Sequence, residues 1–124
     1  MTRTDVDVVL RAFDALNRGD VDAFVSEMDA EVVFEQGDVF LLDLSPVYHG
    51  HEGVRRWFQE AIVEPWEILT ADPLELRDEG GGRVVQVIRL SGRGRGSGAE
   101  VEMRIRQTLT IREGRIKHRQ IEEA

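Results

Sequence analysis

The chain contains no cysteine, so disulfide bonds, thiolate metal sites and cysteine nucleophiles are all excluded. Aromatic residues make up only 6% of the sequence. The longest uninterrupted apolar run, Val39 to Leu42, is far shorter than the ~20 residues that a membrane-spanning helix requires. Acidic residues stand near the amino terminus, where an export signal has an apolar stretch. We therefore expect a cytoplasmic protein that does not bind membranes.

Basic residues are outnumbered and unevenly distributed. The 124 residues include 16 Lys and Arg against 24 Asp and Glu, which gives a formal charge of −8. Residues 83–119 hold 10 of the basic side chains, but these alternate with apolar residues and lack the interleaved aromatic residues that stack on bases. We interpret them as the solvated face of a sheet, and we expect no nucleic-acid partner.

The first half of the chain has mainly helical periodicity. Apolar residues recur at helical spacing along one stripe, which ends before Gly19 and comprises Val6, Val9, Leu10, Phe13 and Leu16. Asp20 is placed to cap a short second helix, and the apolar positions from Val54 to Ile62 predict a third. Between them, residues 32–36 have the composition of a strand.

From Trp66 onward the apolar period changes to two, which is typical of strands. Glycine-containing turns divide this region into strands at 66–77, 83–93, 100–112 and 115–122, and Pro73 indicates a bulge or a sheet edge in the first of them. Helices followed by an antiparallel meander predict an α+β fold. We expect a single domain over residues 1–124, with flexible ends at about 1–4 and 122–124.

Four short motifs follow one another in a specific order. They are Asn17-Arg18-Gly19-Asp20, the segment 48–55 that opens the third helix, the glycine-rich segment 93–98, and Gly114-Arg115-Ile116. In this order and spacing the chain resembles the SnoaL-like branch of the nuclear-transport-factor-2-like superfamily, over roughly residues 5–122. The resemblance implies a conical roll in which a curved, mainly antiparallel sheet packs on three helices around one apolar pocket. It also implies a homodimer, for which we expect the outer sheet face to be the interface.

Members of this branch include ketosteroid isomerases, polyketide cyclases, epoxide hydrolases and dehydratases, so the fold alone does not choose a reaction. The resemblance implies an internal pocket for a small, mostly apolar, oxygen-bearing molecule, with cofactor-free isomerase, cyclase or hydratase chemistry where catalysis occurs. The alternative is a non-catalytic dimeric interaction module. The tyrosine and two acids of ketosteroid isomerases fall near Ala12, Gln36 and Gln107. Because none of the three is kept, we expect no isomerase activity of that type.

Amides interrupt the apolar rows of two predicted strands. Gln107 shares a strand face with Ile105 and Leu109, and Gln36 shares one with Phe34. A buried amide needs a partner, so each of these either bonds a neighbour or faces a ligand. With the surrounding aromatic residues they give a predicted ligand-binding set of Phe13, Phe34, Gln36, Trp57, Trp66, Gln107 and Arg119.

The last strand allows two registers. Ile116 and Ile121 are five residues apart, so they cannot share a face without a bulge. One register turns Arg119 inward, where its guanidinium would select an enolate, carboxylate or phenolate. The other turns His118 inward, where its imidazole would be a general base. Both residues are therefore catalytic candidates, and by analogy with relatives we favour the register with Arg119 inward.

Two further segments carry titratable residues. Asp38 lies in the apolar loop 37–46, and closure of this loop over the pocket would bury its carboxyl group and make it a third catalytic candidate. His49 and His51 precede Glu52, but a zinc site needs three or four converging ligands and the chain has only one other histidine. We expect neither a metal nor a cofactor.

Overall fold

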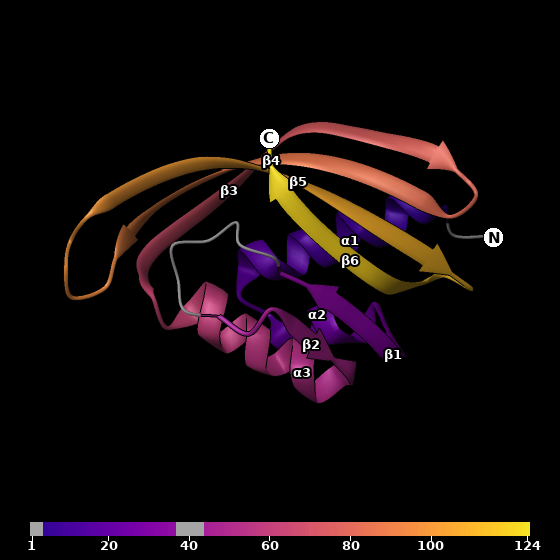
Figure 1. Cartoon of the computed structure of the whole chain (residues 1–124), viewed down its shortest axis with the longest axis horizontal. Coiled ribbons are helices and arrows are strands. Elements are labelled where there is room, and N and C mark those ends of the chain that lie inside the picture. Colours follow the sequence, from indigo (N-terminus) through magenta and orange to yellow (C-terminus); the bar gives the residue numbers. More distant parts are fainter. Residues whose placement is uncertain (1–3, 37–43) are drawn as a thin grey trace.

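The computed structural model describes residues 4–36 and 44–124. The fold is α+β, as predicted: a curved sheet of six strands arches over three α-helices (Figure 1). Most of the loop predicted at 37–46, including Asp38, lies outside the described residues. None of the helices within 4–36 and 44–124 is long and apolar enough to span a bilayer.

Helix α1 (Asp5–Arg18) begins at Thr4, whose hydroxyl accepts a backbone hydrogen bond, and ends at Gly19, which has a φ of 70°. The predicted stripe is only partly right, because Leu10 is 44% exposed. The buried face consists mainly of smaller residues, Val8, Val9, Ala12 and Ala15. Small side chains allow the helix axis to lie close to the sheet, which leaves the larger residues of the stripe at the flank of the contact.

Helix α2 (Val21–Ser26) is capped by Asp20, as predicted. Helix α3 (Gly50–Trp57) continues without a break into the π-helical segment η1 (Phe58–Val63). The predicted third helix therefore exists, but its carboxyl-terminal part is wound more widely than an α-helix, a feature often found beside functional sites.

The sheet has the strand order β2-β1-β6-β5-β4-β3. All neighbouring strands are antiparallel except β1 and β6, which are parallel. Strand β2 was not predicted, because three residues are too few to show a period. Pro73 lies at a register shift in the edge strand β3, as predicted. The strands are β1 (Met28–Glu35), β2 (Val47–His49), β3 (Trp66–Gly80), β4 (Arg83–Gly94), β5 (Glu100–Arg112) and β6 (Arg115–Glu123).

Both ends that were expected to be flexible include residues with regular hydrogen bonds. Thr4 forms the amino-terminal cap of α1, and β6 pairs with β5 as far as Glu123, which lies opposite Ile105. The segments predicted to be flexible, 1–4 and 122–124, therefore include a helix cap and residues of a paired strand.

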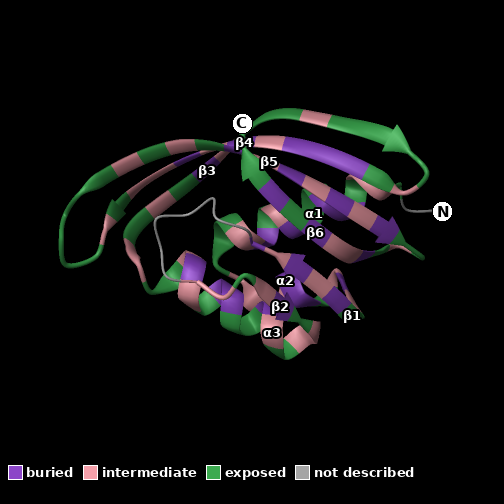
Figure 2. Ribbon diagram, viewed as in Figure 1, coloured by how far each residue is buried: buried purple, intermediate pink, exposed green. Residues whose placement is uncertain are grey.

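The core lies between the concave face of the sheet and the helices. Helix α1 packs against β3, β4, β5 and β6, and α3 packs against β1. Buried residues accordingly alternate with more exposed ones along the strands and helices that enclose this core (Figure 2). Four aromatic rings from α2, β1, α3 and η1 pack against one another, with centroids 5.1–6.4 Å apart in the contacting pairs: Phe24, Phe34, Trp57 and Phe58.

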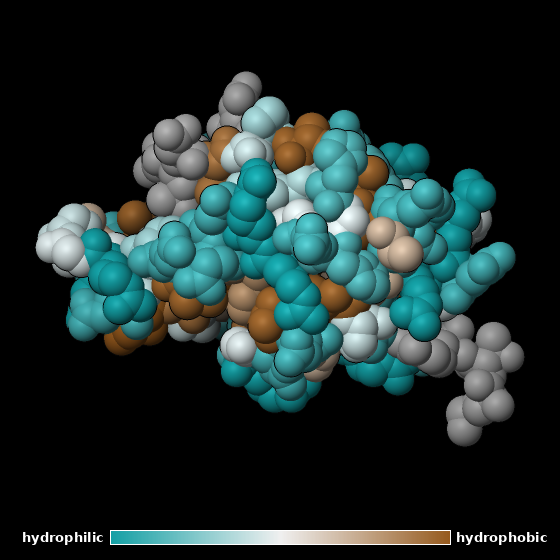
Figure 3. Space-filling model, turned by 90° about the horizontal axis from the view of Figure 1, so that it is seen from below, coloured by the Kyte–Doolittle hydropathy of each residue, from teal (hydrophilic) through white to brown (hydrophobic). Residues whose placement is uncertain are grey.

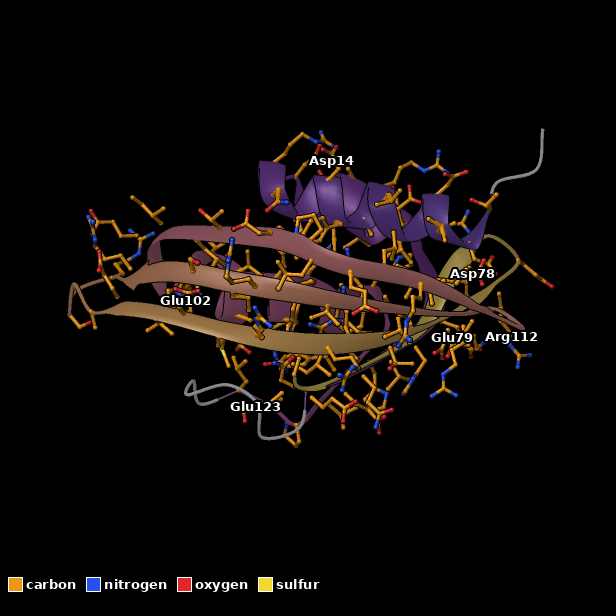
Figure 4. The ribbon with its side chains drawn as sticks, turned by 90° about the horizontal axis from the view of Figure 1, so that it is seen from above. Asp14, Asp78, Glu79, Glu102, Arg112 and Glu123 are labelled. Carbon is orange, nitrogen blue, oxygen red and sulfur yellow. The ribbon has the colours of Figure 1, made fainter. Side chains whose placement is uncertain are left out.

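Charged side chains lie on the outside of this arrangement. Asp14 projects from α1 away from the sheet, and Asp78, Glu79 and Arg112 gather at the turns at one end of the strands (Figure 4). Seen from below, the surface is mostly hydrophilic with smaller apolar areas between the polar ones (Figure 3). A charge inside the molecule is therefore an exception that needs a physical account.

Candidate functional site

A bulge in β6 determines which side chains of the last strand face the helices. Lys117 is an extra residue in β6, because its two neighbours pair with consecutive residues of β5. The bulge allows three residues to point inward, and Ile116, Arg119 and Ile121 are 1%, 5% and 5% exposed. Each of the two predicted registers thus describes one part of the strand, and Arg119 lies inward.

The guanidinium of Arg119 lies against aromatic rings and amides. Its Cζ is 5.0 Å from the ring centroid of Phe34 and 4.7 Å from that of Trp57. Its Nε donates a hydrogen bond to Oε1 of Gln107 at 2.8 Å, and its Nη1 donates to Oε1 of Gln36 at 3.3 Å. Within residues 4–36 and 44–124, no carboxylate forms an ion pair with this cation.

Burial lowers the pKa of Arg119 to about 9, because loss of water disfavours the charged form. The group is still a cation at neutral pH. A guanidinium has five N–H donors, and the hydrogen bonds within the described part of the chain engage only Nε and Nη1. Nη2 therefore remains available, and rings and neutral amides compensate the buried charge less completely than an acidic partner would.

The amides beside Arg119 all turn their oxygen toward a donor. Because Arg119 occupies Oε1 of Gln107, the Nε2 of Gln107 points onward and donates to Oε1 of Gln86 at 2.7 Å. Oε1 of Gln36 also accepts from Nε1 of Trp57 at 2.9 Å. The chain of polarised amides ends in two buried Nε2 groups, on Gln36 and Gln86, that have no hydrogen-bond partner in the described part of the chain.

Gln86 was not among the residues predicted from the sequence, although a signal was present. Val84, Gln86, Ile88 and Leu90 share one face of β4, so the amide interrupts an apolar row in the way that identified Gln107. The two amides lie directly opposite each other in the ladder between β4 and β5. Applying the same rule to each strand would have found both.

A cavity of about 50 Å³ lies against Arg119 and Gln107, between α1 and the sheet. Its other walls are apolar, so Arg119 is the only ionisable side chain that lines it within the described residues. This volume holds a few water molecules, and it is far below the ~300 Å³ at which small-molecule pockets begin. It is also smaller than the pocket that the resemblance implies. The predicted binding residues that line it are Phe13, Phe34, Trp57, Gln107 and Arg119.

The other two predicted binding residues lie outside the cavity wall. Gln36 is directly behind it, where it contacts both Trp57 and Arg119. Trp66 lines a separate groove of about 260 Å³ between the end of α1, η1 and β3. The indole Nε1 of Trp66 donates to the carbonyl oxygen of Ala61 at 2.8 Å, and the ring covers Gly92, where a Cβ atom would approach it to 2.8 Å.

The three histidines do not line the cavity. His118 lies on the outer face of the sheet, where its Nε2 is 2.8 Å from Oε2 of Glu35. His51 donates through Nε2 to the carbonyl oxygen of Met28 at 3.0 Å, and His49 is exposed. In the described ranges 4–36 and 44–124, no three side chains of the metal-binding types converge. Asp38, as stated, lies outside those ranges.

A second buried polar group, also not predicted, belongs to the framework around the site. The hydroxyl of Tyr48 donates to Oε1 of Glu60 at 2.8 Å and accepts from the backbone N–H of Ser45 at 3.1 Å. Desolvation raises the pKa of Tyr48, and the hydrogen bond to Glu60 raises it further. This cluster links β2 to η1, and it has no residue in the cavity wall.

Comparisons with known proteins agree with this fold. A family profile described as SnoaL-like domain matches residues 9–119. A putative polyketide cyclase from Sinorhizobium meliloti is 27% identical, with a TM-score of 0.74 and 94% of each chain covered. An NTF2-like protein from Burkholderia thailandensis is 22% identical, with a TM-score of 0.86 over 99% of this chain and 92% of its own. TerC, co-crystallised with polyporic acid, is 16% identical, with a TM-score of 0.82 over 97% and 91%. A search of curated proteins gives no match.

Proposed function

The chain belongs to the SnoaL-like domain family, and we propose that it binds a small, largely apolar molecule beneath the curved sheet through an acidic oxygen held by Arg119. The proposal rests on one observation: a buried cation at the cavity has only rings and neutral amides as partners among the described residues. An anionic ligand would supply the missing charge.

The donor geometry favours particular ligand chemistry. A guanidinium binds planar oxygen acids through parallel hydrogen bonds, and Nη2 of Arg119 is available for them. The apolar walls favour a hydrocarbon body, so the ligand class is a small apolar carboxylate, phenolate or enolate. The structure of TerC with polyporic acid supports the view that this fold can accommodate an acid.

The chemistry that the described wall could perform is limited to charge stabilisation. A positioned guanidinium stabilises negative charge that develops on an oxygen, as in an enolate. Proton transfer also needs a group that titrates near neutral pH, and no carboxylate or imidazole of residues 4–36 and 44–124 lines the cavity. We therefore place binding before turnover. An isomerase, cyclase or hydratase reaction would need a base from outside this wall.

A matched pair of ligands tests the proposal. In calorimetric titrations we expect 4-phenylbutyrate to bind at least tenfold more tightly than its neutral amide, because only the acid pairs with the cation. In Arg119→Gln this difference should disappear. Arg104→Gln removes an exposed arginine from β5 and should leave it intact. Equal binding of the acid and the amide to the unmodified protein would contradict the proposal.

For the quaternary structure we propose a homodimer through the outer sheet face. Acidic and basic side chains alternate there, with Arg89 near Glu102 at 4.0 Å and Arg106 near Glu122 at 3.5 Å. A second copy rotated by a two-fold axis can therefore match opposite charges across the interface. Sedimentation analysis should give twice the chain mass, and Arg106→Glu should shift the equilibrium toward monomer.

A further inference from the structure

The cavity and the groove beside it are adjacent hollows that share a wall. Leu16, Ile62 and Ala71 line both of them. We infer that the two hollows form one elongated binding site, which takes an apolar acid with its acidic end at Arg119 and its body in the groove. This inference rests on the proposed function and adds the shape of the ligand and its route of entry.

The volumes favour one site over two. The cavity of about 50 Å³ holds the acidic group and little more, whereas the groove of about 260 Å³ has no ionic partner as deeply buried as Arg119. Together they reach the lower limit of small-molecule pockets, ~300 Å³. A ligand confined to the cavity would lack contact area, and one confined to the groove would leave the cation without an anion.

The shared wall consists of side chains that can move. Leu16 and Ile62 are both partly exposed, so each has room to change rotamer. Leu16 lies in the last turns of α1, and Ile62 belongs to the π-helical segment η1. They come from different elements and line both hollows, and we call these two residues the threshold between the groove and the cavity. The chemistry of the threshold is purely apolar.

The groove itself has an apolar interior and a mostly polar rim. Phe58 is buried and Trp66 and Leu69 are partly buried, whereas the rim consists of exposed residues, namely Val63, Asn17, Arg18 and Glu67. Arg18 is held at the surface by Asp14 at 2.8 Å and Asp20 at 3.4 Å, so it does not offer a second anion site inside. The body of the ligand should therefore be hydrocarbon until it reaches solvent.

Hydrogen bonds fix the wall of the groove that contains Trp66. Arg95, in the turn between β4 and β5, donates through Nη2 to the carbonyl oxygen of Trp66 at 2.8 Å and through Nε to that of Glu64 at 3.1 Å. The hydrogen bond from Trp66 to Ala61 fixes the indole as well. This wall is thus preorganised, and only the side chains of Leu16 and Ile62 must change position when a ligand enters.

Two acids with the same head test the inference. Butyrate and 4-phenylbutyrate share a carboxylate and a three-carbon chain, but only the latter carries a ring that can lie in the groove. We expect 4-phenylbutyrate to bind at least tenfold more tightly, with binding followed by calorimetry on the protein with Trp66 intact. Leu16→Trp should remove this advantage, because its indole would fill the threshold through which the ring extends into the groove.

Controls distinguish blockage from general damage. Leu10→Trp places the same ring on the exposed side of α1 and should affect neither acid. Ile62→Trp blocks the threshold from η1 instead, in case Leu16→Trp does not fold. Equal affinities of the two acids, or an advantage that survives both folded threshold variants, would overturn the elongated site. The proposed function would then still stand if butyrate binding is lost in Arg119→Gln. Tight binding of 4-phenylbutyrate that does not depend on Arg119, or no binding of either acid, would overturn both.

Discussion

Two adjacent residues of β6 illustrate how this sheet distributes charge. His118 faces outward and meets the carboxylate of Glu35, and both side chains keep contact with water. Arg119 faces inward and meets Phe34, Trp57 and amides. The outer arginines Arg89 and Arg106 resemble His118, since each has an acidic neighbour. The protein thus pairs its charges where water already screens them and leaves a cation uncompensated by the described carboxylates where water is excluded.

This difference indicates what each face is for. Exposed ion pairs contribute little to stability, so the outer pairs mainly set solubility and association. A buried cation costs free energy, and a fold retains it for a gain elsewhere. The expected gain here is affinity for an acid.

The largest expected effect concerns Trp57, the aromatic residue on which the buried guanidinium of Arg119 lies. Trp57 is 2% exposed, stacks on Phe24 and lies beneath Arg119. Trp57→Ala should lower the free energy of unfolding by about 3–5 kcal/mol. Urea unfolding measures this, and Trp66→Ala, which truncates the partly buried tryptophan of the groove, should cost clearly less. A larger loss in Trp66→Ala would show that the centre of the core lies elsewhere.

Giving the inner cation an acidic partner should remove the contrast between the faces. In Gln107→Glu a carboxylate stands where Nε of Arg119 now meets an amide at 2.8 Å. The internal ion pair neutralises the cation, so the affinity for 4-phenylbutyrate should fall at least tenfold. Thr108→Glu adds the same charge to the outer face of β5 and should have little effect. Unchanged affinity in Gln107→Glu would indicate that the acid does not bind at Arg119.

The pH dependence of binding sharpens the comparison. The acid binds the protonated guanidinium, so affinity is lost as the pH rises through the pKa of residue 119. With the pKa of Arg119 at about 9, binding should be constant between pH 6 and 8. In Arg119→Lys the affinity should decline severalfold within that interval, because burial lowers the pKa of a lysine by several units. Parallel profiles for the two proteins would contradict this expectation.

Substitution of His118, the outward-facing residue of the two, should have the smallest effect on stability and binding. His118→Gln should change the free energy of unfolding by less than about 1 kcal/mol, because water can replace the partly exposed hydrogen bond to Glu35. It should also leave acid binding unchanged. A loss of binding comparable to that in Arg119→Gln would indicate that His118 belongs to the binding site.

The sequence predicted the fold class, the helices and five of the strands, because these depend on periodicity and on turn and capping residues that act locally. The sequence also predicted part of the cavity wall, because the alternation of side chains along their strands identifies Gln107 and Phe34 as inward-facing. The inward position of Arg119 was one of two predicted registers, and only the pairing with β5 distinguishes them. The distance of Trp66 from the cavity depends on the packing of η1 against β3, which no local pattern encodes.

The bulge at Lys117 has a consequence for chains of slightly different length. Because this residue has no partner on β5, its removal would leave a regular ladder, with Ile116 and Arg119 on the inward side as before. Loss of His118 would let Lys117 take its outward place, again without turning the guanidinium away. The strand therefore tolerates a one-residue deletion here, and a homologue lacking that residue presents the same cation by regular alternation, whereas simple counting from Ile116 along the last strand of this chain would assign Arg119 to solvent.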